Sequence, residues 1–159
     1  MITTAVPALT LADLTARTGL DVLDHLEREV TIPVVAGPQA QGDLIVIPMA
    51  MLPHVRLTSW ASSQDVPAAG IELLRSAAGG NPHSLVADPG TCRWTLGVHD
   101  PVRLALGLLE ASAVAYLIHP EHGATGIAPG RYLIRRQRER DATGLGFGFA
   151  RAGNRMVCD

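Results

Sequence analysis

The chain has 159 residues, of which 47% are hydrophobic and 18% are charged, and its net charge at pH 7 is −2. This composition excludes global disorder, and the length suits one compact domain. All 13 basic residues are arginine, so any chemistry that needs a lysine amine, such as a Schiff base or a P-loop, is excluded.

The charge is unevenly distributed along the chain. Residues 1–130 carry 6 arginines and 12 acids, a balance of −6, whereas residues 131–159 carry 7 arginines and 3 acids, a balance of +4. A basic C-terminal segment on an acidic body permits contact with nucleic acid, with an acidic partner or with a second copy of the chain.

Cysteine usage and hydropathy bear on the compartment. Cys92 and Cys158 form no C-x-x-C pair, which excludes a zinc ribbon and a thioredoxin-type motif. The N-terminus lacks a secretory pattern, and the most apolar stretch, residues 104–118, is short and contains Glu110. We therefore expect a soluble, cytoplasmic protein with reduced thiols and no membrane association.

Residues 1–30 are predicted to form a helical appendage to a β-rich domain over residues 31–159. Thr10 can cap a helix that runs to Arg17, with Asp13 as capping-box partner and Gly19 as its end. Leucines at helical spacing predict a second helix over residues 20–30. This outline resembles a helix-turn-helix, but four acids in the second segment would repel phosphates. Sequence-specific DNA binding is therefore disfavoured, and a packing or docking role is favoured.

After Val30 the chain reads as short apolar strands separated by glycine and proline. The expected strands cover residues 31–35, 43–47, 55–60, 85–87, 93–98, 102–109, 113–119 and 131–140, while residues 70–74 fit either a strand or a short helix. Strands at this spacing predict a single, mainly antiparallel β-barrel or β-sandwich with a short N-terminal helical segment. The stretch GLGFGF at 144–149 is expected to form a hairpin tip rather than a nucleotide loop.

Histidines form the densest polar cluster. His119 and His122 lie in the sequence HPEHG, and His83 ends the loop sequence GGNPH. Pro120 argues against a helical H-E-x-x-H zinc motif. His83, His119 and His122 are candidate ligands for a divalent metal such as zinc, and two of them could instead act as acid and base. The alternative is that they are structural histidines at strand ends and that the protein binds no cofactor.

Arginines concentrate in the segment 131–140. Strand alternation places Tyr132, Arg136 and Arg138 on one face and Gln137 and Glu139 on the other. Because arginine binds phosphate and carboxylate with two hydrogen bonds, this strand is a candidate site for a phosphate ligand or a partner. The alternative is that its arginines are solvated or pair with acids on neighbouring strands.

Five sequence segments in order carry a resemblance. They are GDLIVIP at 42–48, GGNPHSL at 79–85, HPEHG at 119–123, PGRY at 129–132 and RQRE at 136–139. Together they resemble an uncharacterised family of small bacterial and phage-associated proteins with a GD-strand, a G-[HN]-x-H loop, an [HP]-E-H-G turn and a P-G-x-Y strand ending in R-Q-R-E. The similarity covers residues 42–139 and the final residues 155–159.

The resemblance implies no activity, but it implies one shared site. That site would contain His83, His122, Tyr132, Gln137 and Glu139. Asn81 stands where related sequences often have a histidine, which removes one metal ligand, and the glycine- and phenylalanine-rich stretch resembles an insertion.

Two functional hypotheses remain open. The first is a binding or assembly module that forms homo-oligomers or binds a protein partner. The second is a small histidine-dependent phosphodiesterase or nuclease, with or without a metal, acting on RNA or another phosphate ligand. In it His83, His122 and Glu139 are catalytic, and Tyr132, Arg136, Gln137 and Arg138 bind the substrate.

Overall fold

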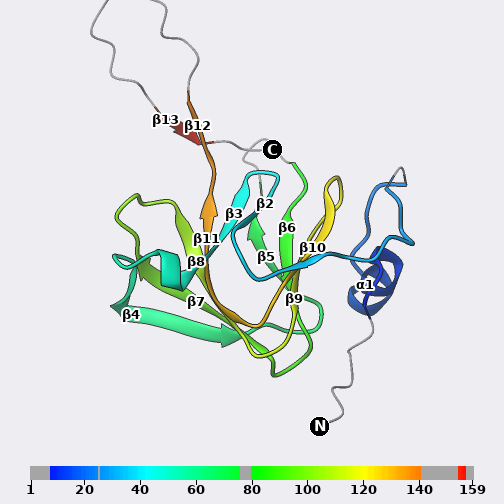
Figure 1. Ribbon diagram of the computed structural model, residues 1–159, viewed down its shortest axis with the longest axis horizontal. Helices are drawn as coiled ribbons and strands as arrows, with labels where there is room; N and C mark the ends of the chain where they lie inside the picture. Colours follow the sequence, from blue (N-terminus) through cyan, green and yellow to red (C-terminus); the bar gives the residue numbers. More distant parts are fainter. Residues whose placement is uncertain (1–7, 25, 76–79, 141–153, 157–159) are drawn as a thin grey trace, which may run out of the picture.

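The computed structural model describes residues 8–24, 26–75, 80–140 and 154–156. Two β-sheets pack together as a β-sandwich, and a short helix lies beside one of them (Figure 1). The predicted fold class, mainly β with a short N-terminal helical segment, is therefore confirmed, and the form that it takes is a sandwich.

The sheets have five and six strands. The five-stranded sheet contains, in spatial order, β1 (Val34–Val35), β10 (Gly123–Ile127), β9 (Ala115–His119), β6 (His83–Val86) and β5 (Ile71–Leu74). The six-stranded sheet contains β2 (Gln39–Gln41), β3 (Leu44–Pro48), β11 (Gly130–Arg136), β8 (Ala105–Ala111), β7 (Cys92–His99) and β4 (Arg56–Asp65). A separate pair is formed by β12 (Arg138–Arg140) and β13 (Asn154–Met156), and a 3-10 turn, η1 (Met49–Met51), follows β3.

Helix α1 (Leu11–Thr18) forms where the local signals place it. The side chain of Thr10 accepts a hydrogen bond from the backbone of Asp13 at 3.1 Å, and the Asp13 carboxylate accepts one from the backbone of Thr10 at 3.0 Å. Gly19 ends the helix in the left-handed conformation, with φ of 70°. The predicted capping box and helix end are therefore confirmed.

The predicted second helix over residues 20–30 is wrong. The described residues of this segment form turns and bends that run back along α1. Their backbone groups bond to distant partners: the Leu23 amide donates to the Pro120 carbonyl at 2.8 Å, and the Arg28 carbonyl accepts from the Ala12 amide at 2.8 Å. These contacts replace the i to i−4 bonds of a helix, so the helix-turn-helix outline is also wrong.

The strand predictions are correct for most of the chain. Residues 70–74 resolve as a strand, β5, while the expected strand over 31–35 is reduced to β1, which pairs in parallel with β10. Strands β2 and β10 were not expected from the sequence. In β10 the missing side chain of Gly126 lets β1 approach, because a Cβ there would lie 2.8 Å from Cγ2 of Val34.

Apolar side chains fill two regions. The main core lies between the sheets and includes Leu44, Leu85, Leu109, Leu117 and Ile134, each with 0% exposure. A second cluster joins α1 to the other face of the five-stranded sheet, and it is formed by Leu11, Leu14, Val22, Ile32, Val86 and Ile118. The N-terminal segment is thus packed onto the sandwich. In the part of the chain that the structure describes, no helix has the length and apolarity needed to cross a membrane.

Candidate functional site

One end of the sandwich gathers the polar residues of four separate segments. These are the β2–β3 turn with Asp43, the start of β6 with His83, the β9–β10 turn with His122, and Gln137 after β11, and Figure 1 shows the four segments at the same end. The Gln137 amide donates to the Asp43 carbonyl at 2.7 Å, which ties the end of β11 to the β2–β3 turn.

Three histidines form a compact cluster here. Because β6 and β9 pair Ser84 with Ile118, the next position sets His83 beside His119, and their ring centroids lie 4.4 Å apart. His122 lies 4.5 Å from His119 and 6.2 Å from His83, again between ring centroids. The first two histidines are buried and His122 is exposed. The three residues predicted as metal ligands are therefore brought together.

Both ring nitrogens of His83 face side-chain oxygens. Its Nε2 donates to Oδ1 of Asp43 at 2.7 Å, and its Nδ1 lies 3.2 Å from Oε1 of Gln41. The Gln41 amide nitrogen faces the carbonyls of Leu117 and Gly123, which fixes the orientation of this side chain. Burial lowers the pKa of His83, and the neighbouring His119 lowers it further, while Asp43 opposes them. His83 is 2% exposed, so among the three histidines it is His122 that faces the surface.

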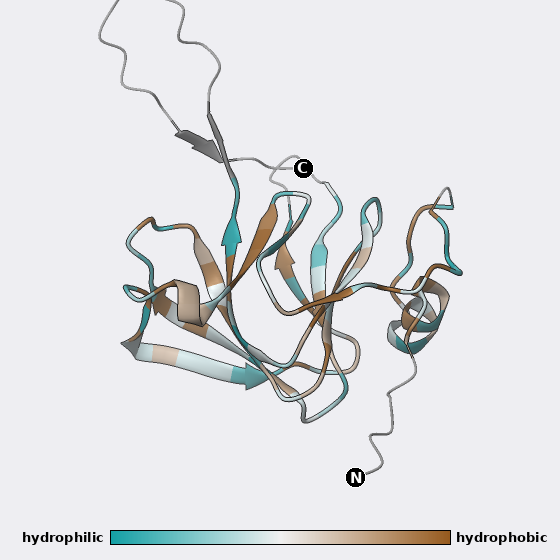
Figure 2. Ribbon diagram, in the orientation of Figure 1, coloured by the Kyte–Doolittle hydropathy of each residue, from teal (hydrophilic) through white to brown (hydrophobic). Residues whose placement is uncertain are grey.

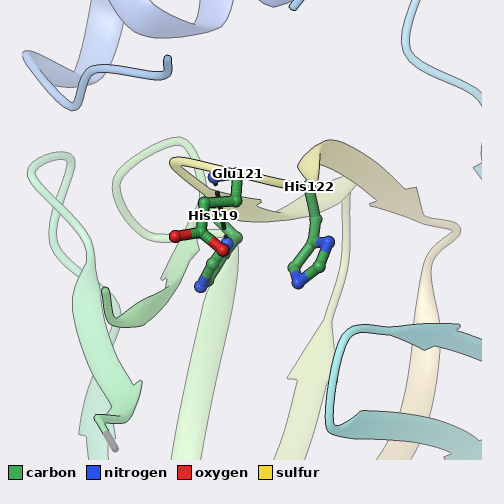
Figure 3. A group of neighbouring side chains, drawn as sticks. All are labelled: His119, Glu121 and His122. Carbon is green, nitrogen blue, oxygen red and sulfur yellow. Dashed lines mark hydrogen bonds between the residues drawn. The ribbon is translucent and has the colours of Figure 1, made fainter. Parts of the chain in front are cut away.

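His119 has a defined tautomer. The backbone amide of Glu121 donates to its Nδ1 at 3.1 Å, so the proton lies on Nε2, which donates to the carbonyl of Asn81 at 3.1 Å. The side-chain amide of Asn81 also donates to the Glu121 carboxylate at 3.1 Å. Figure 3 shows the side chains of His119, Glu121 and His122 pointing in one direction from the β9–β10 turn.

Tyr132 is not part of this cluster. Its side chain is 3% exposed in the core between the sheets, and its hydroxyl donates to the Ala36 carbonyl at 3.4 Å. It lies five residues before Gln137 along β11, which is about 17 Å in an extended strand. The side chains of Arg138 and Glu139 lie outside the described residues, as do Cys158 and residues 144–149. Arg136 ends β11 and is half-buried.

The other arginines of β11 pair with acids from neighbouring segments. Arg131 bonds Glu110 of β8 at 2.9 Å, and Arg135 forms two bonds, of 3.0 and 2.7 Å, with Asp100. Paired arginines were the alternative to a phosphate site on this strand. For these two residues the structure favours that alternative.

Four residues of the site were missed by the sequence argument: Gln41, Asp43, Asn81 and Glu121. Each lies inside a motif that the sequence does show, GD at 42–43, GGNPH at 79–83 and HPEHG at 119–123, or directly before it. The signal in the sequence was a carboxylate directly before the apolar run 44–47, because an acid next to a buried strand needs a partner; in the structure Asp43 is 3% exposed and bonds His83.

The fold and site define a β-sandwich domain with a histidine cluster at one end. Its family follows from a match over residues 40–137, more than half of the chain: the protein belongs to the DUF8820 family, whose description is a domain of unknown function. No curated protein and no solved structure matches the chain. The matched segment contains His83, His119 and His122, and also Gln137.

Proposed function

We propose that this domain is a self-associating binding module, which pairs with a second copy of itself through the free edge of the six-stranded sheet. The observation that carries the proposal is strand β4. It has ten residues, stands at the end of the sheet order, and among the described strands pairs with β7 alone. An edge strand of this length presents unpaired backbone N–H and C=O groups that suit pairing with a strand of another chain.

The side chains on this edge support the same role. Trp60 is 75% exposed, and Leu57 on β4 and Leu96 on β7 are about half exposed. The register between β4 and β7 shifts between Leu57 and Ser62, so the regular ladder covers the two ends of β4, residues 56–57 and 62–65, and these are the parts that a second copy would pair. Tryptophan is among the residues that contribute most binding energy in interfaces. Figure 2 shows β4 mostly in pale shades, with hydrophilic colour at its arrowhead.

Charge along the strand favours a second copy as the partner. Arg56 begins β4, Asp65 ends it, and no charged residue lies between them. When two β4 strands pair in antiparallel fashion, the start of each lies beside the end of the other. Arg56 of each copy then meets Asp65 of the other, which gives two favourable cross-strand pairs around an uncharged centre.

Light scattering coupled to size exclusion tests this proposal. We expect a mass twice the 16.8 kDa of one chain for the wild type, and a monomer for Trp60→Glu, which places a charge in the interface. Met51→Glu is the matched control, because Met51 is 58% exposed in η1, outside β4. It is expected to remain dimeric. A monomeric wild type at high concentration, or a dimeric Trp60→Glu, would refute the proposal.

A histidine-dependent phosphodiesterase is the second candidate function, and the observation that favours it is the close grouping of the three histidine rings, with centroids 4.4, 4.5 and 6.2 Å apart. In this function the exposed His122 contacts the substrate, while the buried rings of His83 and His119 position the His122 ring. The test is cleavage of a short RNA by the wild type and by His122→Ala, with His54→Ala as control for an exposed histidine elsewhere. Equal rates for the wild type and His122→Ala, or no cleavage by either, would remove this candidate.

A further inference from the structure

We propose that the β9–β10 turn binds one divalent transition-metal ion, with zinc as the preferred metal, through His119, Glu121 and His122. The inference does not depend on self-association. It also differs from the ligand set expected from the sequence, because Glu121 takes the place of His83. His83 is not in the group of three whose ligand atoms lie within 4.8 Å of one another, and its Nε2 is bonded to the Asp43 carboxylate at 2.7 Å.

The three side chains have the composition and spacing of a metal site. One ligand atom from each can be chosen so that all three lie within 4.8 Å of one another. Around a tetrahedral zinc ion, ligand atoms lie about 3.4 Å apart, so metal binding needs the three ligand atoms to move closer together and the Glu121 amide to leave Nδ1 of His119. Two histidines and one carboxylate are a ligand set of catalytic zinc sites, in which the fourth position stays open to water or substrate.

The tautomer of His119 suits this role. A histidine that binds a metal through one nitrogen usually donates its other N–H to a carbonyl or carboxylate. In His119 the Nε2–H already donates to the Asn81 carbonyl, which directs the lone pair of Nδ1 toward the turn. The Glu121 amide now donates to this lone pair, and the metal would replace that contact.

Asn81 acts as a support for two ligands. Its carbonyl fixes the His119 ring, and its side-chain amide donates to the carboxylate of Glu121 at 3.1 Å. Because Asn81 lies before β6 while the ligands lie at the end of β9 and in the turn after it, one residue from another segment orients the turn. Mutation of a supporting residue of this kind typically lowers metal affinity by about 10–100-fold.

Equilibrium dialysis of the full, untagged chain against Zn²⁺ tests the site, and the absorption spectrum with Co²⁺ reports its geometry. We expect one equivalent of Zn²⁺ per chain and the intense visible bands of four-coordinate Co²⁺. Glu121→Gln and His122→Ala, both at exposed positions, should each weaken Zn²⁺ binding by at least about 10-fold. Asn81→Ala should weaken it about 10-fold without changing the stoichiometry.

Two controls separate this site from weak binding to surface histidines. His54 and His99 are exposed and lie on other segments, so His54→Ala and His99→Ala should bind Zn²⁺ as the wild type does. Trp60→Glu should also bind normally, whatever its oligomeric state. Absence of stoichiometric binding, or equal losses in His54→Ala and His122→Ala, would overturn the inference.

Discussion

Replacing Asp100 with alanine is expected to cause a large loss of stability. Its carboxylate is 2% exposed and accepts two hydrogen bonds from Arg135, at 3.0 and 2.7 Å. The backbone amides of Val102 and Leu104 donate to the same carboxylate at 3.3 and 3.2 Å. Asp100 therefore joins the loop after β7 to the central strand β11.

The magnitude follows from burial. Arg135 is 16% exposed, so removal of Asp100 leaves its guanidinium buried without a counter-charge. Breaking a buried pair from one side costs about 3–5 kcal/mol, and the partial exposure of Arg135 favours the lower end, about 3 kcal/mol. For a chain of this size, this corresponds to a decrease in Tm of about 6–12 °C.

The pair of Arg131 and Glu110 is the matched control. Its distance is similar, 2.9 Å, but its side chains are 57% and 40% exposed, so Glu110→Ala should cost less than about 1 kcal/mol. Urea unfolding of the wild type and both variants measures the two costs. Equal losses of stability in the two variants would refute the reasoning that burial sets the cost.

The pH dependence gives a second readout for Asp100. Burial alone would raise its pKa, but hydrogen bonds from Arg135 and from the Leu104 backbone outweigh burial and lower the pKa below 3.8. The unfolded state then binds the proton first, so this part of the stability is present above pH 3.8 and is lost as pH falls through the folded-state pKa. The difference in unfolding free energy between the wild type and Asp100→Ala should therefore become smaller as pH falls below 3.8. A difference that stays constant with pH would contradict the lowered pKa of Asp100.

Three further predictions concern buried positions. Because burial lowers the pKa of His83 below 6.5, unfolding free energy should fall as pH drops below about 6.5 in urea titrations, and a flat profile would contradict this. Burial raises the pKa of Cys92 to about 12, so a Cys158→Ala protein should react with a thiol reagent only after denaturation, and rapid native labelling would disprove it. A methyl group at Gly107 would overlap the Trp94 indole, so Gly107→Ala should cost about 1–3 kcal/mol in the same titrations, and an unchanged midpoint would contradict the packing.

Local signals predicted α1, whereas distant contacts decide the residues that follow. The capping box of Thr10 and Asp13 and the glycine at 19 lie within ten residues of one another. The residues that begin and end this helix can therefore be recognised from the local sequence alone. In residues 20–30 the leucine spacing is helical, but the Leu23 amide binds the carbonyl of Pro120, almost a hundred residues away. No periodicity in the segment itself reveals that contact.

The candidate site shows a similar division. The HPEHG turn identifies His119 and His122 from the sequence, but the proximity of His83 depends on the register of β6 with β9. Glu121 was available in the same turn, and its value as a ligand becomes visible only through its contact with Asn81. Tyr132 was grouped with the histidines by resemblance, but it lies near the start of β11, whereas the histidine cluster lies beyond the end of that strand. The sequence does not show at which end of the sandwich a strand begins.

Hydrogen exchange of the β4 backbone at low and high protein concentration tests the central claim of self-association most directly. The claim predicts that amides of β4 become more protected as concentration rises, while those of β2, the opposite edge of the same sheet, exchange at constant rates. In Trp60→Glu this dependence on concentration should disappear. Exchange in β4 that is independent of concentration in the wild type would contradict the claim.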